Sequence, residues 1–135
     1  ISLGLVGSEM CIRDRMTTEE IAGKLAFFHE QIHMIHWETR SFAEHKATGA
    51  FYEFLQDFKD EIIEKIMGYT GKRIQALKIE PISPKADPMQ IVDDVLKFSK
   101  SLEAYGEANK FGDVCNMAQA LSGEAAKTKY LLTLS

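Results

Sequence analysis

The sequence predicts an all-α protein, a ferritin-like four-helix bundle with a long crossover between its second and third helices. Apolar residues recur at helical spacing in four segments, and no segment has the alternating pattern of a strand. About fifteen residues separate the second and third segments. Because an extended chain spans roughly 3.3 Å per residue, this stretch can run back along a helix of about 30 Å.

The first helix is expected to begin after Thr17, because Thr17 and Glu20 have the spacing of a capping box. Its end is expected between Arg40 and Ala43. Spacing at the helical period predicts an inward-facing stripe. This stripe consists of Ile21, Leu25, Phe28, Ile32, Ile35 and Phe42.

The second helix is expected to open at residues 46–48, which leaves His45 in the preceding turn. Gly68 and Gly71 lie near its end, where glycine weakens a helix. Its inward stripe consists of Phe51, Leu55, Phe58, Ile62, Ile66 and Tyr69.

Residues 72–86 include Pro81 and Pro84 and have no sustained period, so they are predicted to form the crossover. Asp87-Pro88 predicts the third helix start, since a capping side chain precedes a proline at the first helical position. The expected inward residues are Ile91, Val95, Phe98, Leu102 and Tyr105.

A break at Phe111-Gly112 precedes the fourth helix, for which Asp113 is the expected cap. The fourth helix is expected to continue nearly to the end of the chain. Its inward stripe consists of Val114, Met117, Ala118, Leu121, Ala125 and Leu132.

Composition excludes several classes of protein. Hydrophobic residues make up 45% of the chain and charged residues 27%, as in ordinary globular proteins. A net charge of −4 argues against a surface that follows nucleic-acid phosphates. No apolar run approaches the roughly 20 residues that span a bilayer, so no membrane association is expected.

Residues 1–15 resemble translated sequencing-adapter read-through, so we expect a non-native extension there and a bundle domain over residues 16–135. Met16 is the expected natural start. Cys115 is then a single cysteine that cannot form an internal disulfide. A reducing compartment, and hence a cytoplasmic location, is expected.

All four histidines lie within residues 29–45, ahead of a helix with a line of carboxylates. Imidazole and carboxylate together suit divalent transition metals. The carboxylate line is offset about 200° from the core stripe and faces away from the bundle. Its members are Glu53, Asp57, Asp60 and Glu64.

The histidines of the first helix, His29, His33 and His36, are expected on its flank, about 100° from the core stripe. A di-metal site inside such a bundle needs two Glu-x-x-His motifs, and only Glu30-x-x-His33 is present. Imidazoles and carboxylates are therefore expected to meet between two chains, where two-fold symmetry would generate the site twice.

The residues His36-Trp37, His45 and Asp60-x-x-x-Glu64 resemble motifs of the Dps family, ferritin-like proteins that protect DNA in starved bacteria. The steps of fifteen residues from His45 to Asp60 and four to Glu64 match that family's spacing. The chain is similar to a shorter branch of these proteins that is often encoded by viruses.

This resemblance implies an iron site between subunits, with His36 and His45 from one chain and Asp60 and Glu64 from its partner. It also implies ferroxidase activity, in which peroxide or dioxygen oxidises Fe(II). The oligomer would be a two-fold dimer at least, or a hollow shell that stores the ferric product.

The sequence departs from the family pattern at two points. Gly49 stands where the family has an acidic residue, and the nine residues from His36 to His45 are three fewer than usual. The chain also lacks the lysine-rich tail that gives DNA binding in the family, so no strong direct nucleic-acid binding is expected.

Two other functions fit the same residues. One is a non-catalytic ferritin-like bundle that acts as an assembly or interaction protein, with the histidines packed at an interface. The other is zinc or manganese binding without redox chemistry, because these ligands do not select iron. For His29 and His33 a packing role is favoured over a relay or auxiliary site, and Trp37 is either an interface anchor or a quencher of oxidants.

Overall fold

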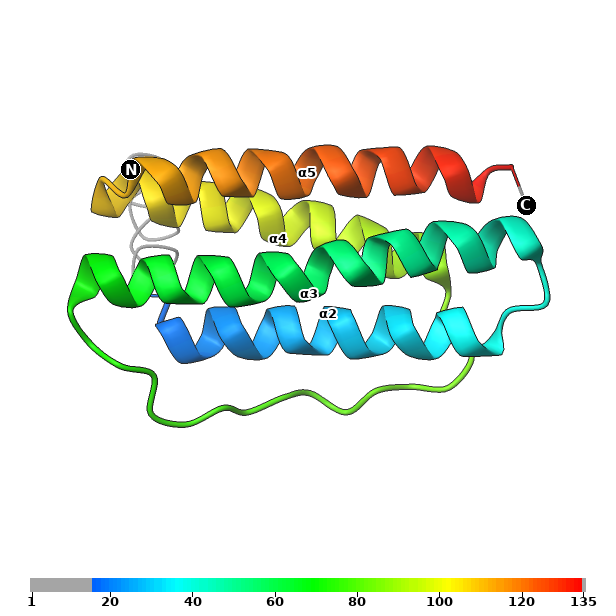
Figure 1. Ribbon diagram of the computed structural model, residues 1–135, viewed down its shortest axis with the longest axis horizontal. Helices are drawn as coiled ribbons and strands as arrows, with labels where there is room; N and C mark the ends of the chain where they lie inside the picture. The colour runs from blue at the N-terminus through cyan, green and yellow to red at the C-terminus, as the bar shows by residue number, and fades with distance from the viewer. Residues whose placement is uncertain (1–15, 135) are drawn as a thin grey trace, which may run out of the picture.

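The computed structural model describes residues 16–134. This part of the chain forms four α-helices and no strand, arranged as a four-helix bundle (Figure 1). The predicted all-α class is therefore confirmed. The expectations for residues 1–15 lie outside the described residues. The helices are α2 (Thr18–Glu38), α3 (Phe42–Thr70), α4 (Pro88–Asn109) and α5 (Gly112–Leu132).

The chain order gives the bundle its ferritin-like topology. α2 packs on α3 and α4, while α5 packs on α3 and α4. Residues 71–87 run beside α2, from the end of the bundle where α3 finishes to the opposite end, where α4 begins (Figure 1). α3 and α4 consequently run in the same direction, and each helix is antiparallel to its packing neighbours.

Polar side chains of α2 hold the crossover against the bundle. The buried amide of Gln31 donates through Nε2 to the Ser83 carbonyl oxygen and accepts at Oε1 from the Ser83 amide, both at 2.9 Å. A buried amide is costly unless its donor and acceptor are both satisfied, so this pair fixes the crossover in register. Carboxylates at the two ends of α2 accept bonds of 2.9 Å from crossover amides: Glu19 from Gln75 and Glu38 from Lys85.

The connection between α2 and α3 differs from the prediction. The capping box of Thr17 and Glu20 forms as expected, but α2 ends at Glu38, before Arg40. Ser41 caps the next helix by accepting from the Glu44 amide, so α3 begins at Phe42 and not at 46–48. His45 consequently lies in the first turn of α3. The prediction that it lies in the preceding turn was wrong.

The start of α5 also differs. Asp87 caps α4 by accepting from the Met89 amide, as predicted. Lys110, at φ 61°, ends α4, and Phe111 precedes α5 without a side-chain cap. Asp113 therefore lies within the first turn of α5, and its predicted capping role was wrong.

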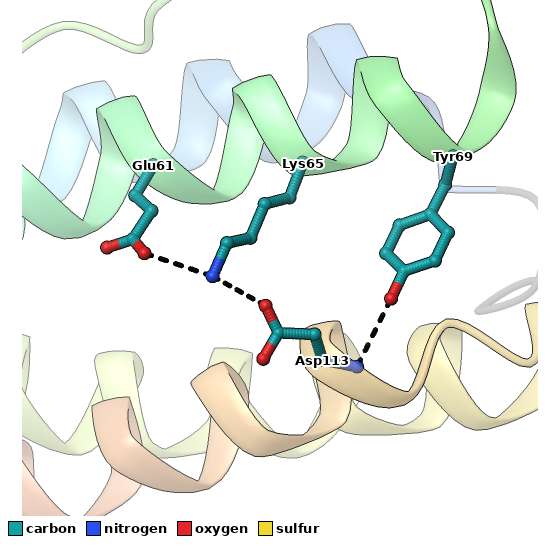
Figure 2. A network of polar contacts seen from close by, with 4 residues as sticks. All are labelled: Glu61, Lys65, Tyr69 and Asp113. Carbon is teal, nitrogen blue, oxygen red and sulfur yellow. Dashed lines mark hydrogen bonds and ion pairs between the residues drawn. The ribbon is translucent and has the colours of Figure 1, made fainter.

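Asp113 instead ties α5 to α3, as Figure 2 shows. The Lys65 ammonium lies 2.5 Å from Asp113 Oδ2 and 3.0 Å from Glu61 Oε1. The Tyr69 hydroxyl accepts from the Asp113 amide at 3.4 Å. Hydrogen bonds to Asp113 and Glu61 raise the pKa of Lys65, so the side chain stays positively charged.

The predicted stripes form the core with three exceptions. Phe42 is 75% exposed because it belongs to α3 and not to α2, and Tyr69 is 45% exposed. The Tyr69 ring stacks on Phe111 with centroids 4.3 Å apart, at the edge of the core. Met117 is only partly buried. None of the helices within residues 16–134 has the length and apolarity needed to cross a membrane.

Substitution of Gly23 by alanine is expected to loosen the crossover. A Cβ at Gly23 would lie 2.4 Å from the Lys78 carbonyl oxygen, so the crossover backbone would have to move. We expect a loss of about 1–3 kcal/mol in the free energy of unfolding, as for overpacking. Urea denaturation measures this loss.

The matched control is Gly123→Ala, since nothing lies within 4 Å of a Cβ at this helical position. Helix propensity predicts a gain of about 0.5–1 kcal/mol for this variant. Equal stability changes in the two variants would contradict the close approach of crossover and helix.

Candidate metal site

His36 and His45 lie face to face where α2 ends and α3 begins. Their ring centroids are 3.8 Å apart with an interplanar angle of 18°. His36 Nδ1 lies 2.8 Å from the His45 carbonyl oxygen, and His45 Nδ1 lies 3.1 Å from the His36 carbonyl oxygen. Because a carbonyl oxygen only accepts, each Nδ1 carries a hydrogen. In the neutral rings the lone pair is therefore on Nε2.

Thr48 supports the same assignment of hydrogens. Its hydroxyl donates to the Glu44 carbonyl oxygen at 2.7 Å, so the hydroxyl oxygen can accept from His36 Nδ1 at 3.3 Å. A histidine that binds metal through one nitrogen commonly donates its other N–H to a backbone carbonyl, which fixes the ring. His36 and His45 both have this arrangement.

Gly49 is explained by the position of the His36 ring. A Cβ at Gly49 would lie 2.9 Å from His36 Cε1 and 3.3 Å from Nδ1. The ring therefore packs directly against the helix backbone, and an acidic side chain at position 49 is incompatible with this ring position. The glycine that replaces the acidic residue of the Dps motif at this position thus makes room for the His36 ring, which pairs with His45.

The other two histidines pack against Tyr52 of α3. The Tyr52 ring lies 4.0 Å from the His33 ring at 16° and 4.9 Å from the His29 ring at 30°, between centroids. His33 also lies 3.9 Å from the Trp37 ring, which is 67% exposed. These contacts agree with the packing role that the sequence favoured.

The environment of His29 differs from the prediction that its side chain lies on the flank of the helix. It is 9% exposed, and its Nε2 is buried without a hydrogen-bond partner, while Nδ1 lies 3.0 Å from Glu30 Oε1. The side chain is buried because the Tyr52 ring of α3 packs over this flank of α2. The pKa of His29 is lowered because burial disfavours the charged ring and because Lys59 adds a like charge, although Glu30 opposes both effects.

Asp60 and Glu64 are exposed on the outer face of α3, as predicted. With Asp57, Glu61 and Lys65 they line a shallow surface hollow. The side-chain hydrogen bond with Asp60 and the charge of Asp60 raise the pKa of Glu64. Lys65 is engaged with Glu61 and Asp113. A cation bound in the hollow would therefore offset the negative charge of Asp60 and Glu64.

The structure brings His36 and His45 together and places Asp60 beside Glu64, but it separates the two pairs. His45 precedes Asp60 by fifteen residues of continuous helix, a rise of about 22 Å. Over residues 16–134, no group of three or more His, Cys, Asp and Glu side chains could hold a metal ion within one chain. The sharing of these residues between two chains stays a prediction.

Comparison with known proteins identifies the family of the chain. The model of a family of unknown function, DUF5856, matches residues 36–132, well over half of the chain. The chain belongs to the DUF5856 family. The matched range of this DUF5856 chain begins at His36 and includes His45, Asp60 and Glu64.

An uncharacterized 14.6 kDa protein from the mobD-ri intergenic region of Enterobacteria phage T4 is similar to the DUF5856 chain. The two are 28% identical over 116 residues, which cover 86% of this chain and 88% of the phage protein. No solved structure matches the chain significantly.

Acidification is expected to destabilise the bundle through His29. Because its pKa is lowered from the ordinary value of 6.5, the stability due to the neutral ring is complete above pH 6.5 and is lost as the pH falls through the folded-state value. Urea denaturation of wild type and His29→Phe between pH 8 and pH 5 measures this contribution. Wild type should lose more stability than the variant, and parallel pH profiles would contradict the burial of a neutral His29.

Proposed function

We propose that the protein is a Dps-like iron-binding protein that captures Fe(II) at a site shared by two copies of the chain, and that it oxidises and sequesters this iron. His36 and His45 of one copy and Asp60 and Glu64 of the other would hold the ion. The observation that supports the proposal is the reciprocal pair of hydrogen bonds, which leaves the Nε2 lone pairs of both imidazoles available. Iron is here a substrate and cargo.

The chemistry of the four side chains fits a divalent transition metal. Two imidazole nitrogens and four carboxylate oxygens could complete the shell of an ion that accepts nitrogen and oxygen ligands. Two carboxylates balance the charge of one divalent ion, and they favour the higher charge of the ferric product. Each Fe(II) would give one electron to peroxide or dioxygen. The same ligands would accept zinc or manganese without this step.

A second candidate is an interaction protein without metal chemistry. The rings of Trp37 and Phe42, at 67% and 75% exposure, favour it because burial of these rings against a partner would stabilise a complex. In this case the paired imidazoles would serve the α2–α3 connection alone. Metal binding by the purified protein separates the two functions.

The decisive experiment mixes two defective variants. Anaerobic calorimetry measures Fe(II) binding by wild type, His36→Ala and Asp60→Ala, and ferric absorbance follows after air is admitted. Each variant alone should lose binding and oxidation. After the variants are mixed and allowed to exchange, about a quarter of the wild-type sites should return, because each mixed dimer regenerates one intact site of two.

The matched control is Glu107→Ala, which removes an exposed carboxylate of α4 and should leave Fe(II) binding unchanged. Wild-type binding by both site variants would refute the proposed function. Loss of binding that mixing does not restore would refute the sharing of ligands between copies.

A further inference from the structure

A pocket opens at the end of the bundle opposite to His36 and His45. α2 begins at this end, and α3 and α4 both finish there (Figure 1). The first turn of α2, the first residues of the crossover and Tyr105 of α4 line the pocket. His36 lies eighteen residues beyond Thr18 along α2, a rise of about 27 Å, so the pocket is remote from the paired imidazoles.

The hydroxyl of Tyr105 has no partner in the protein. Tyr105 is 4% exposed and lines the pocket, and its hydroxyl forms no hydrogen bond within residues 16–134. Buried side-chain nitrogens and oxygens that lack a hydrogen bond are limited, over the same residues, to His29 Nε2. The Tyr105 oxygen is therefore accessible, and the pocket is the opening that it reaches. Hydroxyls on buried tyrosine rings usually have a partner, which a ligand in the pocket would supply.

The crossover adds two cations to the pocket. Lys72 and Arg73 are exposed and line it, and neither forms an ion pair within the described part of the chain. The amide of Thr18, the first of α2, has no acceptor among the same residues, and the helix dipole places partial positive charge there. These groups together favour an anion.

Glu19 opposes an anion, because its carboxylate also lines the pocket. It accepts from the Gln75 amide at 2.9 Å. Hydrogen bonds from the Gln75 amide and from its own amide lower the pKa of Glu19, so the carboxylate is charged at neutral pH. The two free cations and the helix N-terminus outweigh this single charge. The net attraction is greater for a dianion than for a monoanion.

We propose that this pocket binds the phosphate group of a small ligand through Lys72, Arg73 and the Tyr105 hydroxyl. A phosphate carries close to two negative charges near neutral pH, which match the two unpaired cations. Its oxygens can accept from both cations, from the hydroxyl and from the Thr18 amide. The pocket volume of about 720 Å³ lies within the range of about 300–1,000 Å³ for ligand sites, so a phosphate ester fits as well as free phosphate.

Burial of the Tyr105 ring also suits this role. Burial raises the pKa of Tyr105, so the hydroxyl keeps its hydrogen at neutral pH and can donate it to a phosphate oxygen. The buried ring holds the hydroxyl in place, whereas the exposed side chains of Lys72 and Arg73 can adjust to the ligand. The site requires no metal ion and is independent of the proposed function.

Amide NMR titration of the full-length, metal-free chain tests the site. The ¹⁵N-labelled protein is titrated with inorganic phosphate and, separately, with adenosine monophosphate, at about pH 7.5 where phosphate is mainly a dianion. Sodium chloride keeps the ionic strength constant. The amide signals of Thr18, Lys72 and Arg73 should shift and reach saturation with phosphate, and chloride alone should not reproduce these shifts.

Three variants should change the affinity for phosphate in different directions. Tyr105→Phe keeps the buried ring but loses a hydrogen bond to a charged group, so binding should weaken about tenfold. The double variant Lys72→Ala, Arg73→Ala should lose saturable binding. Glu19→Gln removes the opposing charge and can still accept from the Gln75 amide, so binding should tighten about fivefold.

Matched controls lie on α5. Tyr130→Phe removes a hydroxyl from a residue that is 63% exposed, and Lys127→Ala removes an exposed cation. Neither residue lines the pocket, so both variants should bind phosphate as wild type does.

The outcomes decide both the site and the source of the phosphate group. Tighter binding of adenosine monophosphate than of phosphate would support an ester as the ligand, and equal affinity would support free phosphate. Shifts that chloride reproduces, or wild-type affinity in folded Tyr105→Phe, would overturn the proposal. If Tyr105→Phe does not fold, the substitutions at the exposed positions decide: unchanged binding without the two cations, or weaker binding by Glu19→Gln, would overturn it.

Discussion

The reciprocal hydrogen bonds between His36 and His45 are the constraint on which the rest of the site depends. Only residues 39–41 separate α2 from α3, so the rings meet across a tight connection. Each ring gives its Nδ1 hydrogen to the other's backbone, and Gly49 leaves room for His36 against α3. The bonds thus join the two helices and determine which nitrogen can accept a proton or a metal ion.

The acidic half of the site is maintained at a cost to the isolated chain. Asp60 and Glu64 lie close enough to raise the pKa of Glu64, and Lys65, which lines the same hollow, is held by Glu61 and Asp113. Uncompensated like charge on a helix surface is destabilising, and such departures from local stability are common at functional sites. A bound cation would offset this repulsion.

The sequence predicted the bundle, the crossover, the Thr17 and Asp87 caps and most of the core, because helical periodicity and capping are local signals. The sequence did not predict the start of α3, because the Ser41 cap lies among polar residues that also suit a loop. The position of His45 in the first turn of α3 was missed for the same reason. The burial of His29 depends on Tyr52, a contact between helices that periodicity within α2 does not contain. The reason for a glycine at position 49 is likewise visible only in the structure, where the His36 ring packs against it.

The most direct test of the account is the tautomeric state of His36 and His45. Long-range proton–nitrogen correlation spectra of the ¹⁵N-labelled protein, recorded at a pH where both rings are neutral, distinguish a protonated Nδ1 from a protonated Nε2. The account predicts that both rings carry hydrogen on Nδ1 and have an unprotonated Nε2. Hydrogen on Nε2 in either ring would contradict it, because that nitrogen could then not bind a metal ion.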